Sequence, residues 1–139
     1  MLKVVNLVKV FSVLIFLGTL SLVYAYMPIM VKLDEEGVAE IHKENFFYGS
    51  VGVFIVVNVL ILVIQNIINK KAIDEFLKAW VGGFTFIFNL YLAFIIGFLG
   101  VLNNPTHIPA SSYYYLNWLG PIMVLAWLIG LIFLVLKRK

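Results

Sequence analysis

The sequence predicts an all-α membrane protein with four transmembrane helices in an up-down bundle and both termini in the cytoplasm. Hydrophobic residues make up 63% of the chain and charged residues only 12%, against about 25% charged residues in soluble domains. The 58 residues between Lys78 and Lys137 contain no Asp, Glu, Lys or Arg, as expected of two spans joined by a tight connection. We expect residues 1–139 to form a single membrane domain.

The first predicted span covers about residues 4–27. From Val10 to Val31 there are 22 uncharged residues, preceded by Lys3 and Lys9, which is enough to cross a bilayer. A cleaved signal peptide is the alternative, because two lysines precede an apolar core and residues 23–25 resemble a small-residue cleavage site. The length of the apolar stretch favours a retained span.

An acidic outer loop, residues 28–45, follows the first span. Asp34-Glu35-Glu36-Gly37 predicts a turn, and Val38–Asn45 is expected to be a short helix or an irregular lead into the second span. The alternating Glu40, His42 and Glu44 could ligate a divalent metal. No metal-binding spacing supports that hypothesis, so we interpret the loop as solvated and expect no metal or cofactor.

The second span, about residues 46–68, concentrates its polar residues late. Asn58, Gln65 and Asn69 are spaced by seven and four, so they share one helix face. In the short connection that follows, Asp74 is placed to cap the third helix, and Glu75 suits its positive N-terminal end.

The third span, about residues 76–102, carries a stripe of small and polar residues at steps of three or four. Its members are Gly82, Thr85, Asn89, Ala93, Gly97 and Gly100. Small residues let membrane helices approach closely, so we expect this span to be the hub of the bundle, flanked by spans two and four. Asn58 should then reach Asn89. An interhelical hydrogen bond is the favoured interpretation of this pair, and a polar pocket or permeation path is the alternative.

The fourth span covers about residues 113–136. Ser111 or Ser112 is expected to cap it, Gly120-Pro121 to bend it, and Trp127 to pack inside the bundle with an acceptor for its indole N–H. The preceding loop, residues 103–112, contains His107 between two prolines. It is either interfacial or re-entrant.

The distribution of bases sets the predicted orientation. One side collects two bases, Lys32 and Lys43, whereas the other collects eight: Lys3, Lys9, Lys70, Lys71, Lys78, Lys137, Arg138 and Lys139. The positive-inside rule therefore places both termini in the cytoplasm. We expect a multi-pass protein of the cell inner (plasma) membrane.

Several function classes lose support from composition. No acid, base or histidine lies well inside a span, although proton relays usually need one. Cysteine and recognisable catalytic motifs are absent, and the dispersed bases disfavour nucleic-acid binding. We therefore expect no catalytic residues. The favoured function is a non-enzymatic scaffold or accessory subunit, in contact with the lipid bilayer and with another membrane protein or further copies of itself. A small transporter or channel component is the alternative.

The start of the outer loop resembles a known family. Tyr26-Met27-Pro28, followed by Val31 and Gly37, is similar to the segment after the first span of the SdpI-type immunity and signalling membrane proteins. The resemblance covers about a dozen residues. Met27 stands where that family usually has leucine, and Lys32 and Asp34 replace a proline and a histidine. The resemblance implies an immunity or signal-transducing role and transfers no site residue.

Overall fold

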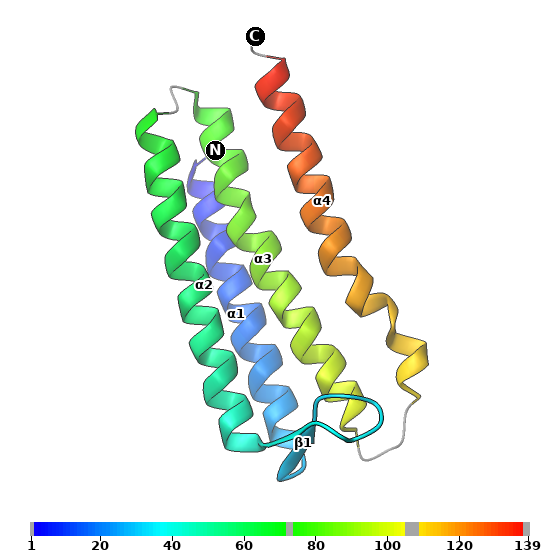
Figure 1. The fold of residues 1–139 in the computed structure, drawn as a ribbon. Helices are drawn as coiled ribbons and strands as arrows, with labels where there is room; N and C mark the ends of the chain where they lie inside the picture. Colours follow the sequence, from blue (N-terminus) through cyan, green and yellow to red (C-terminus); the bar gives the residue numbers. More distant parts are fainter. Residues whose placement is uncertain (1, 72–73, 105–108, 138–139) are drawn as a thin grey trace.

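A computed structural model describes residues 2–71, 74–104 and 109–137 (Figure 1). It contains four long helices: α1 (Leu2–Tyr26), α2 (Lys43–Lys71), α3 (Glu75–Leu102) and α4 (Tyr115–Leu136). Each is long and apolar enough to cross a membrane, which confirms the prediction of four helices with the length and composition of membrane spans. The N- and C-terminal marks lie at the same end of the molecule (Figure 1).

Helix α3 occupies the centre of the arrangement. It packs against α1 most extensively, then against α4 and α2, whereas α1 and α2 approach each other over a much smaller area. Figure 1 shows α4 beside α3, on the side away from α2. Within α3 only Glu75, Phe76 and Ile95 are exposed. The third span is therefore the hub in geometric terms, because every other helix packs against it.

An apolar core lies where α1, α2 and α3 meet. Phe16 and Leu20 of α1 are 1% exposed, and Ala93 and Ile96 of α3 are also buried. The ring of Phe16 stacks on Phe54 of α2, with centroids 4.2 Å apart and planes 3° from parallel. Because α1 supplies this core, it is an integral part of the fold.

A two-stranded antiparallel hairpin joins α1 to α2. Strand β1 (Met30–Lys32) pairs with β2 (Glu40–His42), with Val31 opposite Ile41. The predicted turn at residues 34–37 is confirmed: Gly37 has φ of 70°, and the Asp34 carboxylate accepts hydrogen bonds from the backbone N–H groups of residues 38 and 39. The expectation of a short helix or an irregular lead over Val38–Asn45 was wrong for Glu40–His42, which pair with β1 as a strand, and α2 already begins at Lys43.

Asn103 attaches the hairpin to the end of α3. Its side-chain oxygen accepts from the backbone N–H of Lys32 at 2.7 Å, and its amide nitrogen donates to the Lys32 carbonyl at 2.9 Å and the Leu99 carbonyl at 2.8 Å. One amide thus pairs like an additional strand residue while also capping α3. Val31, the central residue of β1, is fully buried beneath this attachment.

Of the two predicted helix caps, one is confirmed and the other is wrong. Asp74 caps α3 as predicted, accepting hydrogen bonds from the N–H groups of Phe76 and Leu77. Neither Ser111 nor Ser112 caps α4. A 3-10 helix (Ala110–Tyr113) leads directly into it through Tyr114, which has helical backbone angles and makes no side-chain cap. His107 lies outside the described residues.

Candidate functional site

Buried amides and hydroxyls form the most distinctive polar feature of the bundle. Six side chains make up this polar seam between α1, α2 and α3: Lys9, Ser12, Asn58, Gln65, Thr85 and Asn89. Its middle cluster centres on Asn89, which is fully buried. Asn89 and Asn58 exchange two amide hydrogen bonds of 2.8 and 3.1 Å. Asn89 also donates to the Ser12 hydroxyl at 3.0 Å, so three helices meet at one side chain.

The second cluster of the polar seam lies nearer the start of α3 and centres on Gln65, which is 4% exposed. Its amide nitrogen donates to the Thr85 hydroxyl at 2.9 Å and to the Val81 carbonyl at 3.1 Å. Its oxygen accepts from the Lys9 ammonium at 3.1 Å. The Ser12 hydroxyl donates to the Lys9 carbonyl, so the two clusters share the same turn of α1.

These contacts determine what the polar seam can do chemically. Among the described residues, no buried side-chain nitrogen or oxygen lacks a hydrogen-bond partner. Five of the six seam side chains are uncharged amides or hydroxyls, and Lys9 is the sole ionisable member. The geometry is therefore suited to fixing helix positions, since interhelical hydrogen bonds in membranes contribute about 0.6 kcal/mol on average.

Sequence reasoning missed the contribution of α1 to this site. Lys9 was counted only as a base preceding the uncharged stretch of the first span, yet its ammonium reaches across from α1 to Gln65 of α2. Ser12 was not assigned to any contact between helices, whereas the structure places its hydroxyl against Asn89. The three-residue spacing of Lys9 and Ser12 was the available signal, because it places both on one face.

The stripe on α3 faces an unexpected neighbour in addition to an expected one. Spans two and four were predicted to flank it, and Asn89 and Thr85 do bond to α2, but Gly82 and Gly100 lie against side chains of α1. A Cβ added at Gly82 would lie 2.7 Å from Val5, and one at Gly100 would lie 2.8 Å from Val23. Short connections do not decide which helices pair, because polar bonds and close glycine contacts also bring α1 against α3.

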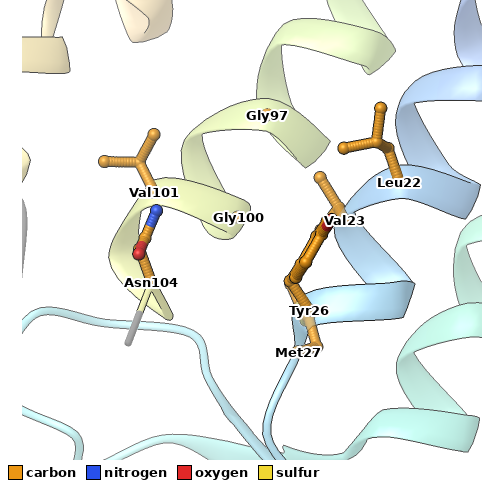
Figure 2. A pocket seen from close by; sticks show the side chains of 8 residues that line it. All are labelled: Leu22, Val23, Tyr26, Met27, Gly97, Gly100, Val101 and Asn104. Carbon is orange, nitrogen blue, oxygen red and sulfur yellow. The ribbon is translucent and has the colours of Figure 1, made fainter. Parts of the chain in front are cut away.

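Gly97 occupies a different environment from the rest of the stripe. A Cβ there would meet no heavy atom within 4 Å. Figure 2 shows why: Gly97 and Gly100 lie along a groove of about 540 Å³ between α1 and α3, with Leu22 and Val23 on the opposite wall. Close packing therefore does not explain Gly97, whereas Ala93 lies in the core at 5% exposure.

Aromatic rings and glycines form the contact between α3 and α4. The indole N–H of Trp80 donates to the Trp127 carbonyl at 3.1 Å, and the indole N–H of Trp127 donates to the Trp80 carbonyl at 2.9 Å. Gly130 lies against the Trp80 ring and Gly120 against the Tyr91 ring, so closely that a Cβ at either position would overlap the ring. Trp127 thus has the acceptor that its buried indole was predicted to need.

The acidic loop does not gather its titratable side chains into one place. Glu40, His42 and Glu44 are all exposed, and the His42 ring accepts a hydrogen bond from the backbone N–H of Glu44. Within residues 2–71, 74–104 and 109–137, no group of three or more His, Asp or Glu side chains is arranged to hold a metal ion.

Comparisons of this chain with protein-family models, with curated proteins and with solved structures found no match. Function must therefore be argued from the geometry of the chain itself.

Proposed function

We propose that the chain is a multi-pass protein of the cell inner (plasma) membrane, with its four helices in up-down order and both termini cytoplasmic. Four membrane-length helices, the excess of bases at the end that carries the termini, and the shared position of the N and C marks (Figure 1) support this arrangement. Reporter fusions after Lys139 and within residues 34–40 should report opposite sides of the membrane. Signals from the same side would contradict the arrangement.

We further propose that the protein acts as a non-enzymatic scaffold or accessory subunit through helix packing. The observation that carries this proposal is the use of the polar side chains inside the spans. Asn58, Gln65, Thr85 and Asn89 all bond across helix boundaries, so their hydrogen-bonding capacity stabilises the bundle. A rigid helical unit with large exposed apolar faces on α2 and α4 is suited to packing against another membrane protein.

The scaffold role predicts a defined complex. The full chain should be extracted from its native membrane in a mild detergent and its mass measured directly. A second membrane protein present at a fixed ratio supports the accessory role, especially if overproducing the chain alone yields a smaller species. A chain that is monomeric in both preparations would contradict it.

A small transporter or channel component is the second candidate, because the polar seam extends from the Gln65 cluster to the Asn89 cluster between the helices. Such a role needs a continuous polar path, whereas Asn89 is fully buried, so a path would require several copies or an opened state. Homo-oligomers that let ions or small polar solutes leave sealed liposomes would favour this candidate. Increased toxin sensitivity on deletion would instead favour the immunity role implied by residues 26–37.

A further inference from the structure

A pocket of about 340 Å³ lies between α2 and α3, beside the hairpin that precedes α2. The buried Phe16 of α1 lines it, and so do Leu33 and Ile41 of the hairpin. The residues that the first two turns of α2 contribute follow steps of three and four and so share one helix face: Phe46, Gly49, Ser50 and Val53. A cavity of about 150 Å³ holds benzene, so this α2–α3 pocket has room for about twice that molecule.

The α2–α3 pocket opens to the surroundings of the bundle, which in a membrane are lipid. Gly49 and Val53 on the α2 wall are exposed, and so is Ile95 on the α3 wall. The small residue at position 49 leaves the space open, since a Cβ added there would meet no heavy atom within 4 Å. Further along the two helices, Asn58 and Asn89 bond to each other. An apolar molecule can therefore enter from the side without breaking the contact between α2 and α3.

Two polar side chains of α2 line the pocket without a hydrogen bond. Within the part of the chain that the structure describes, the Ser50 hydroxyl and the Asn45 amide bond to no other group. Ser12 and Thr19, in contrast, donate their hydroxyls to carbonyls of their own helix, as serine and threonine in helices often do. Ser50 is half-buried, and a hydroxyl withdrawn from water without a partner costs free energy. The pocket therefore offers donors to a ligand that carries an acceptor oxygen.

The charges near the pocket do not favour an ionic ligand. Among the described residues that line it, none is charged. The ammonium of Lys43, at the start of α2, lies over the Tyr24 ring at 4.8 Å from the centroid. Glu44 is exposed and follows it directly along the chain. The acceptor that suits Ser50 and Asn45 is therefore a neutral oxygen, such as that of an ester, rather than a carboxylate or a phosphate.

The position of the two donors along α2 indicates which neutral oxygen is present there. With 29 residues, α2 is about 43 Å long, which matches a bilayer of about 40–45 Å including its headgroup regions. Asn45 lies about 3 Å and Ser50 about 10 Å from the start of the helix. The hydrocarbon core begins about 6 Å below the surface, so the two side chains lie on either side of its boundary. The ester groups of glycerolipids lie at this boundary, with the glycerol above and the acyl chains below.

We propose that the α2–α3 pocket binds one acyl chain of a membrane glycerolipid in the leaflet next to the hairpin. The ester carbonyl accepts a hydrogen bond from Ser50, the glycerol oxygens lie near Asn45, and the chain fills the apolar part of the pocket. A partner helix does not fit, because one turn about 10 Å wide and 5.4 Å long occupies about 420 Å³, more than the pocket holds. The proposal does not rest on the scaffold role, so its failure would leave the mass of the extracted complex unchanged.

The test compares two ligands that differ at one group. Decanoylglycerol carries the ester carbonyl, whereas decyl glyceryl ether has a chain of the same length and the same glycerol without it. Each is titrated into the full chain in dodecyl maltoside, a detergent that has no ester. Native mass spectrometry measures bound ligand, and the melting temperature measures the stabilisation that binding gives. We expect the wild type to bind the ester about fivefold more tightly than the ether, since one hydrogen bond contributes about 1 kcal/mol.

Two pairs of variants connect this preference to the pocket. Ser50→Ala removes the donor, and Ser21→Ala, the control, removes an exposed hydroxyl of α1 that lies outside the pocket. Gly49→Leu fills the pocket. Its control is Gly52→Leu on the same helix, because a Cβ at either glycine meets no heavy atom within 4 Å but Gly52 does not line the pocket. We expect Ser50→Ala to bind the ester as weakly as the ether and Gly49→Leu to lose both ligands, whereas both controls should behave like the wild type.

Three results would overturn the proposal. The first is equal binding of the ester and the ether by the wild type. The second is an ester preference that survives in Ser50→Ala, because the carbonyl would then lie elsewhere. The third is binding by Gly49→Leu as tight as by Gly52→Leu, because the ligand would then lie outside the pocket. If Gly49→Leu does not fold, the ratio of ester to ether binding in the wild type and in Ser50→Ala decides the question without it.

Discussion

The two sides of α3 are held by different interactions. Toward α1 and α2, the polar seam bonds amides and hydroxyls across helix boundaries. Toward α4, glycines sit against aromatic rings and two tryptophans exchange indole hydrogen bonds with backbone carbonyls. Hydrophobic burial cannot select among helices inside a bilayer, because lipid is as apolar as leucine. Both sides therefore use interactions that depend on close geometry, one through directional bonds and the other through shape.

The glycines on α4 should give the largest effects. Gly120→Ala and Gly130→Ala would push a Cβ into the rings of Tyr91 and Trp80, and overpacking of this kind costs about 1–3 kcal/mol. Gly83→Ala and Gly97→Ala are the matched controls, because a Cβ at either site meets no atom within 4 Å. Alanine favours helix by about 1 kcal/mol, so the controls should be neutral or stabilised in melting experiments. Equal losses at all four sites would remove the distinction between packed and open glycines.

The contrast between packed and open positions also changes what is expected of leucine substitutions in the stripe of small and polar residues on α3. From spacing alone, leucine at Ala93 or Gly97 should disrupt the bundle, whereas leucine at Phe94 or Phe98 should be tolerated. Ala93→Leu should still be harmful because Ala93 is buried. Gly97→Leu should be tolerated because its side chain can enter the groove of Figure 2. Melting temperatures of the four variants in one detergent distinguish the two expectations. Spacing alone predicts that Gly97→Leu is as harmful as Ala93→Leu, whereas the structure predicts that it is tolerated.

The tryptophan pair should have an intermediate effect. Trp80→Phe and Trp127→Phe keep an aromatic ring but remove one indole N–H each, which costs about 0.6 kcal/mol for an average bond between membrane helices. Trp118→Phe is the control, because Trp118 is 68% exposed. Melting experiments should show similar small losses for the two paired tryptophans and none for the control. A loss as large for Trp118→Phe would mean that ring size, and not the bond, is being measured.

The acidic loop of residues 28–45 should matter least, since neither side of α3 depends on its acidic side chains. Replacing Glu40, His42 and Glu44 together by alanine should leave the melting temperature in detergent within about 2 °C, because exposed substitutions rarely exceed about 0.5 kcal/mol. The wild type should likewise not respond to a chelator. A large loss in the triple variant, together with stabilisation of the wild type by one added divalent ion, would establish a metal site in this loop.

Periodicity and composition predicted most of the fold. The observed helices begin and end within a few residues of the expected spans, because long uncharged stretches leave few alternatives. Asp74 was predictable as a cap because an aspartate just before a helix can accept hydrogen bonds from its first backbone N–H groups. The strand over Glu40–His42 was not, because a three-residue strand is defined by its partner rather than by its own residues.

The candidate site was predictable in part. Repeated small and polar residues on α3 indicated a packing face. The similar depths of Asn58 and Asn89 in their predicted spans indicated that the two amides meet. That α1 lies against this face could not be read from chain order, because any helix can neighbour any other in a bundle of four. The rings opposite Gly120 and Gly130 depend on how α4 is rotated, which its evenly apolar sequence does not specify.

The most direct test of the account is a double-mutant cycle on Asn58 and Asn89, with free energies of unfolding measured by titration with a denaturing detergent. Asn58→Leu or Asn89→Leu alone leaves the other amide without its partner, whereas the double variant leaves neither. The two exchanged bonds predict that the double variant costs about 1 kcal/mol less than the sum of the single variants. Additive losses would contradict direct bonding between α2 and α3, and with it the polar seam as the feature that positions the helices.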